Sequence, residues 1–254
     1  MNDYFWQLTW RIPDLQKGTI IATEAFPLDR TSDNDLSPII NWIYSPEKRG
    51  LAYDYKYFDL DLREDTFYAD PDTPTPVEHT YRSHSFSSST EKTLGIFYRK
   101  NGCMQIIDRN NTNYPDLPES LVHISGLSDP DLIITSPSGP ARPPAAIGNE
   151  PDHGYCWYFQ KTTLAQQTSD QDTAYNTALD ILKNDLHPTY ASDLAPVILA
   201  FLNRGDFENA ETMLRENQIG GSDWNYLCEY WQNDLPDDPS NSPLHRFYAS
   251  HGCH

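Results

Sequence analysis

A proline-rich stretch separates two parts of this chain that differ in their hydrophobic pattern. It runs from Ser136 to Pro151 and holds Pro137, Pro140, Pro143 and Pro144. Proline has a fixed φ and no backbone N–H, so it neither continues a helix nor pairs in the middle of a sheet. Before this stretch the chain combines short β-branched runs with one segment of helical spacing, and after it the apolar residues recur at helical spacing throughout.

This change of pattern predicts two domains. A chain of 254 residues has room for two small domains, since a domain takes roughly 100–200 residues. We expect an N-terminal mixed β-sheet domain with flanking helices, of the α/β or α+β class, over residues 1–140. Residues 141–151 are then a proline-rich linker. Residues 152–254 are expected to form an all-α domain with helical hairpins of tetratricopeptide type.

A strand followed by a helix is expected near the start of the sheet domain. Thr19–Thr23 is short, apolar and β-branched, as buried strands are. Apolar residues then recur at helical spacing from Leu36 to Ile43, with Pro38 expected in the first turn. The aromatic segment Tyr4–Arg11 fits either a short helix or an extended approach segment.

Further strands should make the sheet mixed. Asn101-Gly102 is a strong hairpin signal, because both residues tolerate positive φ. It separates two apolar runs, so the strands on either side of it should be antiparallel. The strand candidates are residues 51–69, read as strand or extended chain, and residues 93–99, 103–107 and 131–135.

The second half of the chain is predicted to be helical. Gly205-Asp206-Phe207 followed by Ala210 is typical of the tight helical hairpins of tetratricopeptide repeats, because Asp206 can cap and Ala210 allows close approach. Pro196 either kinks its helix or marks the true start of that helix. The expected helices are residues 155–167, 172–183, 190–203, 206–217, 224–232 and 243–250.

The charge of the chain excludes one class of partner. Thirty-seven acidic residues against eighteen basic ones give a formal net charge of −19. A phosphate backbone attracts Lys and Arg, so binding of bare nucleic acid is not expected. The sequence also contains no apolar run of the ~18–20 residues that a membrane-spanning helix needs.

The four cysteines leave the redox compartment open. Cys103, Cys156, Cys228 and Cys253 allow three disulfide pairings, which would fit an extracytoplasmic protein. They could equally be small buried hydrophobic residues. No two of them form a Cys-x-x-Cys motif, so a redox dithiol is not expected.

One segment has the spacing of a calcium-binding loop. The candidate ligands occupy loop positions 1, 3, 5, 9 and 12, and they are Asp108, Asn110, Thr112, Asp116 and Glu119. Two prolines inside the loop and a strand-like flank favour the alternative, a polar turn. Calcium is therefore the only cofactor that the sequence suggests, and the polar turn is the preferred interpretation.

Two acidic groups and one cysteine are weaker candidates. The acidic cluster consists of Asp59, Asp61, Glu64 and Asp65, and its first two members would share one face of a strand. A solvated edge is the alternative. The group Asp33-Asn34-Asp35 lies where a strand is followed by a helix, a place where α/β proteins bind ligands, but no Gly-rich loop accompanies it and helix capping by Ser32 or Asp35 is the simpler explanation.

The cysteine candidate is Cys156 as a nucleophile beside His153. Such a pair needs hydrogen-bond contact and a third orienting group, and spacing alone is weak support. The chain contains no Gly-x-Ser-x-Gly, Walker, HExxH or dinucleotide motif.

Several short segments of the sequence resemble segments of one family of bacterial proteins. The opening segments are Phe5-Trp6-Gln7-Leu8-Thr9-Trp10-Arg11, Pro13, Lys17-Gly18-Thr19, Ser32-Asp33-Asn34 and Asn41-Trp42-Ile43-Tyr44. The later segments are Gly102-Cys103, Ile107-Asp108, Tyr114-Pro115, Pro143-Pro144-Ala145-Ala146-Ile147, Pro151-Asp152-His153-Gly154, Leu164-Ala165-Gln166-Gln167, Leu227-Cys228 and Trp231. Together they resemble the soluble C-terminal extracytoplasmic region of large, uncharacterised bacterial multi-pass membrane proteins. The membrane part of those proteins is similar to GT-C-like glycosyltransferases, which use lipid-linked sugars.

The resemblance implies a fragment whose membrane helices lie upstream. The domain would face the outside of the cell membrane, with the membrane-embedded part of the same polypeptide as its partner. In such glycosyltransferases the catalytic acid usually lies in an early loop that is absent here, so no catalytic residue carries over.

Three functions are open at this point. The leading expectation is a non-catalytic accessory domain that recognises a peptide or glycan acceptor or docks on the membrane part. The second is a glycan-acting enzyme domain with paired carboxylates, Asp59 or Asp61 with Glu64, which would need one raised pKa in a cleft. The third is a stand-alone protein-interaction module that uses the helical hairpins.

Overall fold

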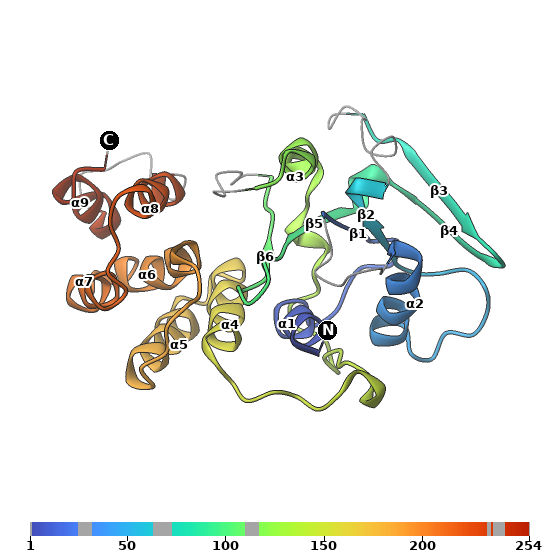
Figure 1. Ribbon diagram of the computed structural model, residues 1–254, viewed down its shortest axis with the longest axis horizontal. Coiled ribbons are helices and arrows are strands. Elements are labelled where there is room, and N and C mark those ends of the chain that lie inside the picture. Colours follow the sequence, from blue (N-terminus) through green and yellow to red (C-terminus); the bar gives the residue numbers. More distant parts are fainter. Residues whose placement is uncertain are drawn as a thin grey trace. The chain divides into compact units, whose positions relative to one another are not determined.

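The computed structural model describes residues 2–24, 32–62, 73–109, 117–232, 235 and 242–253. The described chain forms two compact units, which we treat separately (Figure 1). The sheet unit takes the described residues of 2–100, 104–109 and 117–151, and the helical unit takes 101–103 and those from 152 on. The expected combination of a mixed sheet and a helical C-terminal portion is confirmed.

A four-stranded sheet forms the centre of the sheet unit. Its strand order is β2 (Lys56–Asp59), β1 (Ile20–Thr23), β5 (Thr93–Phe97) and β6 (Gln105–Ile106). The first three strands are parallel and β6 is antiparallel to β5. All residues of these strands are buried, which explains the short continuous apolar runs at β1 and β5. Asn101 adopts a φ of 64° in the β5–β6 connection, and the two strands are antiparallel as expected. The connection spans residues 98–104, so it is longer than the tight Asn-Gly turn that the sequence indicated.

Helix α2 (Asp33–Tyr44) connects the parallel strands β1 and β2. It begins after Ser32, whose backbone N–H and hydroxyl both donate to the Asp35 carboxylate, at 3.0 and 2.8 Å. These bonds lower the pKa of Asp35, so helix capping accounts for this acidic residue. Pro38 was expected in the first turn but lies in the helix interior, because the helix starts at Asp33. Its side chain is on the exposed face.

The two faces of the sheet are covered by different elements. The opening segment is helical, α1 (Asn2–Arg11), and its Tyr4 hydroxyl lies 3.0 Å from the Tyr57 hydroxyl on the same face as Ile21 and Leu94. Side chains alternate along a strand, so Phe58 points to the opposite face. There it meets the ring of His79, with centroids 5.7 Å apart.

His79 belongs to a two-stranded hairpin that the sequence analysis did not find. It consists of β3 (Pro76–Tyr81) and β4 (His84–Ser89), paired from Pro76↔Ser89 to Tyr81↔His84. Its serine-rich second strand has few β-branched residues, so the usual signal is missing. The short helix α3 (Glu119–Ile124) follows later in the chain and buries Leu121 and Ile124.

The predicted strand at residues 131–135 is wrong. Residues Pro130–Leu132 form a 3₁₀ turn, and Ile133 makes only an isolated bridge with Leu15. The Asp129 carboxylate accepts from the Asp131 N–H, and Pro130 is the first residue of the turn. Capping and proline thus favour a turn here, while a short apolar run by itself does not distinguish strand from turn.

The helical unit contains six described α-helices. They are α4 (Tyr155–Gln167), α5 (Gln171–Lys183), α6 (Ala195–Leu202), α7 (Phe207–Glu216), α8 (Ser222–Gln232) and α9 (Pro243–Ser250). Every residue of α6 is buried, and Pro196 lies at its start instead of kinking it. No described helix is long and apolar enough to cross a membrane.

The same turn joins α4 to α5 and α6 to α7. Ser169 and Gly205 adopt left-handed φ values of 57° and 69°. The following aspartates donate their backbone N–H to the carbonyl five residues earlier, Asp170 to Ala165 at 2.8 Å and Asp206 to Phe201 at 3.0 Å. Each aspartate then caps the next helix through its side chain. Both hairpins therefore end one helix and start the next by one set of bonds.

Two disulfides lie in the helical unit and resolve the pairing of the cysteines. Cys103 is bonded to Cys156 and Cys228 to Cys253, with Cα atoms 5.0 and 5.4 Å apart. No free cysteine remains among the four. The sequence separations of 53 and 25 residues mean that each bond closes a long loop, which restricts the unfolded chain.

Substitution of Gly95 should destabilise the sheet unit. A Cβ atom there would lie 3.1 Å from Ile107 Cδ1 and 3.2 Å from Ser128 Oγ, so Gly95→Ala overpacks the core and should cost about 1–3 kcal/mol of unfolding free energy. Urea unfolding followed by tryptophan fluorescence measures the change. The control is Gly139→Ala, whose Cβ would meet no atom within 4 Å. Equal stability of the two variants would contradict the packing argument.

Candidate functional site

The topology of the sheet indicates where a ligand site is expected. The strands β2 and β5 lie on opposite sides of β1, and open parallel sheets bind ligands beside such a switch point, at the carboxyl ends of their strands. Thr23 and Asp59 end β1 and β2 as register partners. The start of α2, with Asp33 and Asn34, comes from the connection between these strands.

A buried lysine is tied to the start of α2. Lys56 is 1% exposed, and its Nζ donates to Asn34 Oδ1 at 2.9 Å. The His79 Nε2 atom lies 3.0 Å from the same Asn34 oxygen. An amide oxygen only accepts hydrogen bonds, so His79 carries its proton on Nε2. Asn34 thereby connects β2, α2 and β3, and these three side chains hold the hairpin and the helix against the sheet.

The acidic cluster is not the strand-face pair that was predicted. Asp59 is the last residue of β2 and is 7% exposed, whereas Asp61 belongs to the 3₁₀ turn Leu60–Leu62. The Asp59 carboxylate accepts from the Asp61 N–H at 3.1 Å, so it stabilises the turn that ends the strand. The solvated-edge alternative does not describe Asp59 either, because it is buried. Glu64 and Asp65 lie outside the described residues.

The predicted calcium loop is only partly described. Asp108 takes part in an isolated β-bridge after β6, and Glu119 is the first residue of α3. Asn110, Thr112 and Asp116 lie outside the described residues, so calcium binding stays a prediction. Among the residues that the structure does describe, no three His, Cys, Asp or Glu side chains are grouped to hold a metal ion.

The candidate nucleophile Cys156 is engaged in the disulfide with Cys103. Its predicted partner His153 instead stacks on Trp157, with ring centroids 4.2 Å apart and planes inclined by 12°. A sulfur in a disulfide has no thiolate to attack a substrate. The cysteine pairing that the sequence left open thus rules out this chemistry in the oxidised chain.

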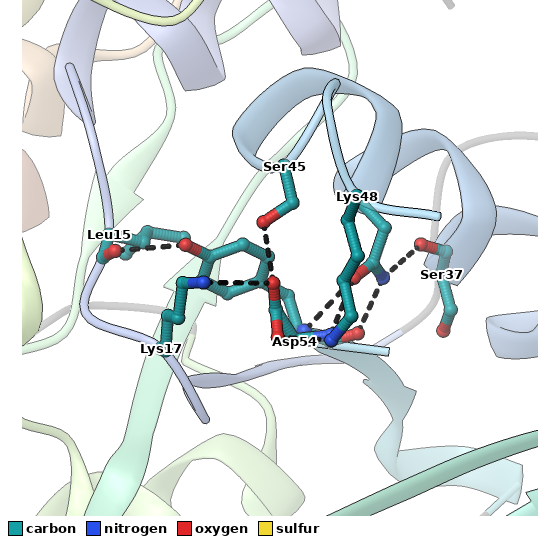
Figure 2. Close-up of polar contacts among 8 residues, drawn as sticks. Leu15, Lys17, Ser37, Ser45, Lys48 and Asp54 are labelled. Carbon is teal, nitrogen blue, oxygen red and sulfur yellow. Dashed lines mark hydrogen bonds and ion pairs between the residues drawn. The ribbon is translucent and has the colours of Figure 1, made fainter. Parts of the chain in front are cut away.

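A polar cluster that was not predicted lies along the outer edge of β2. Figure 2 shows it between α2 and the start of the strand. Asn41 Oδ1 accepts the backbone N–H groups of Asp54 and Tyr55, at 2.8 and 3.1 Å. Asn41 Nδ2 donates to the carbonyls of Tyr55 and Ser37, at 2.7 and 2.8 Å. Ser37 Oγ accepts the Tyr57 N–H at 3.1 Å. These side chains take the place of a further strand and satisfy an edge that would otherwise be open.

Charged and phenolic groups next to this edge are held by neighbours. Asp54 pairs with Lys48 and with Lys17, the latter at 3.5 Å, and accepts from the Ser45 hydroxyl at 2.8 Å (Figure 2). Burial acts to raise the pKa of Asp54, but the bonds from Lys48 and Ser45 outweigh it and the pKa is lowered. The Tyr55 hydroxyl donates to the Leu15 carbonyl at 3.0 Å, and burial raises its pKa to about 12. Neither group is poised for proton transfer near neutral pH.

A sequence signal for this cluster existed but was not used. Ser37 and Asn41 are four residues apart and therefore share one face of α2, and both are buried. Two polar side chains on the buried face of a helix need hydrogen-bond partners. Their spacing could have indicated that α2 bonds to backbone groups of a neighbouring strand.

Comparisons with known proteins returned no relative. No family model, curated protein sequence or solved structure matches the chain. A functional argument therefore depends on the residues and geometry given above.

Loss of Asn41 should destabilise the sheet unit more than loss of a surface amide. Asn41→Ala removes the partners of three backbone groups at Asp54 and Tyr55, and unsatisfied buried groups cost ~1–3 kcal/mol each. Partial access of water should reduce the total to about 2–4 kcal/mol. The control is Asn203→Ala, because Asn203 is exposed and its amide makes a single long bond of 3.5 Å to Gln171. Similar unfolding free energies for both variants would show that the edge does not depend on Asn41.

Proposed function

We propose that this chain is a non-catalytic accessory domain on the extracytoplasmic side of the cell membrane. In this proposal it is joined to a membrane-embedded, glycosyltransferase-like part of the same polypeptide. There it recognises a peptide or glycan acceptor or docks on the membrane part. The main support for the extracytoplasmic location is the pair of disulfides, Cys103–Cys156 and Cys228–Cys253.

Disulfides support this location because of where they persist. They are stable in oxidising compartments outside the cytoplasm and are rare where thiols are kept reduced. Both bonds lie in the core of the helical unit, because Cys103, Cys228 and Cys253 are only 3, 7 and 4% exposed. The attachment to a membrane part is supported by the resemblance of the sequence segments described above.

The recognition role is supported by two equivalent helical hairpins, which we propose to be of tetratricopeptide type. Gly205 follows Ser169 by 205 − 169 = 36 residues, and Asp206 follows Asp170 by the same interval. A tetratricopeptide repeat has about 34 residues. The small residues of the second helices, Ala174 and Ala210, repeat at this interval too, and both are fully buried.

Direct bonds stack the two hairpins on each other. The Tyr175 hydroxyl of α5 donates to Asp206 Oδ2, the cap of α7, at 2.7 Å. Arg204 pairs with Asp172 next to this bond. Repeats that stack in this way bind partners through an extended surface that spans several helices. We therefore place acceptor recognition on the helical unit.

The location is tested with two lysines of opposite exposure. The side chain of Lys17 is 76% exposed, whereas Lys56 is 1% exposed. In spheroplasts that express the native gene, a membrane-impermeant amine reagent should modify Lys17 without lysis. Lys56 should react only after denaturation, which controls for unfolding. Modification of Lys17 that requires lysis would contradict the extracytoplasmic location.

The recognition role is tested with the purified, oxidised chain. We expect it to retain members of a panel of neutral oligosaccharides or of unstructured peptides, measured by affinity mass spectrometry. The reduced and alkylated chain serves as the control and should lose this binding. Failure of the oxidised chain to retain any member of either panel would reject acceptor recognition.

A further inference from the structure

His187 lies in the connection that leads from α5 to α6. Its Nδ1 atom is 3.1 Å from Asn217 Oδ1, and its Nε2 atom is 3.2 Å from Asp185 Oδ1. Asp185 lies two residues past the end of α5, and Asn217 directly follows α7. The imidazole ring thus bridges the ends of the second helices of the two hairpins.

Both groups that face the ring are acceptors. Asn217 Nδ2 donates to the Met213 carbonyl at 2.8 Å, which fixes the orientation of the amide and turns its oxygen toward His187. The carboxylate of Asp185 also only accepts. A neutral imidazole donates from one nitrogen only, whereas the imidazolium ion donates from both. Both hydrogen bonds, to Asn217 and to Asp185, are therefore formed at the same time only when His187 is protonated.

The surrounding charges favour the same state. The bond to Asn217 is the main cause that raises the pKa of His187 above its ordinary 6.5, and the carboxylates of Asp185 and Glu216 add to it. Among the cations at these helix ends, Lys183 is paired with Asp180 at 3.0 Å, and Arg215 donates to Thr212 at 3.2 Å. The His187 side chain is 45% exposed, so it exchanges protons with the solvent.

We propose that His187 is a proton-dependent link between the two helical hairpins. Protonated, it holds the connection after α5 to the end of α7 through two hydrogen bonds. Deprotonated, it keeps only one of them. A group whose pKa is raised in the folded state stabilises that state fully at low pH, and this contribution is lost as the pH rises through the folded-state pKa. The link between the hairpins is thus tight in acid and loosens as the pH rises through the raised pKa of His187.

The titration of His187 tests this proposal. In the intact, oxidised chain, NMR of the His187 ring should give a pKa above 6.5. Asn217→Ala removes the largest cause, so the pKa of His187 should shift down toward 6.5. Hydrogen exchange of the amides of Leu186, His187, Thr189 and Tyr190, corrected for intrinsic rates, should accelerate in the wild type as the pH passes that pKa. In His187→Gln this step should be absent.

The matched control is Asn184→Ala. Asn184 follows α5 as Asn217 follows α7, and its Nδ2 donates to the Asp180 carbonyl at 2.7 Å. This variant loses the same helix-end bond but no bond to His187, so the pKa of His187 should stay at the wild-type value. A wild-type pKa of 6.5 or lower would overturn the proposal. An equal shift in Asn184→Ala and Asn217→Ala would also overturn it. These results do not depend on acceptor binding.

Discussion

The outer edge of β2 is the constraint on which the sheet unit depends. An edge strand exposes a row of N–H and C=O groups that must be satisfied or covered. Here Asn41 and Ser37 of α2 bond to those groups. The bonds fix α2 beside β2 and so position the start of the helix, where Asn34 binds the buried Lys56. The bonds of Ser37 and Asn41 farther along α2 therefore also determine where Asn34 lies at the carboxyl ends of the strands.

The helical unit depends on a repeated local motif instead of a sheet edge. A left-handed residue ends one helix, and the aspartate after it starts the next, at Ser169-Asp170 and again at Gly205-Asp206. These bonds are local, so the turn of each hairpin is encoded by neighbouring residues. The long-range elements are the disulfides and the buried α6, where Trp231 Nε1 donates to the Ala195 carbonyl at 3.1 Å. The proposed recognition surface rests on this framework.

Elements with a strong local signal were predicted from the sequence, and the others were not. The strand at Thr19–Thr23 and the helix that contains Ile40 were found because their apolar spacing matches one periodicity. The hairpin β3–β4 was missed because its serines carry little strand preference. Residues 131–135 were misassigned because Asp129 and Pro130 favour a turn. The strand-to-helix handover near Asp33 was named only as a weak candidate, with capping preferred, and its contacts with Lys56 and His79 were not predicted.

The sequence by itself determined the acidic charge, the helices and strands whose apolar spacing follows one periodicity, and the cap at Asp206. These depend on residues close together in the chain, so periodicity and capping chemistry reveal them. Only the tertiary structure decided the cysteine pairing, the buried state of Lys56 and Asp59, and the use of Asn41 as a substitute strand. Each of these joins residues that are distant in sequence. Their partners are fixed by packing, which brings together groups that no local pattern relates.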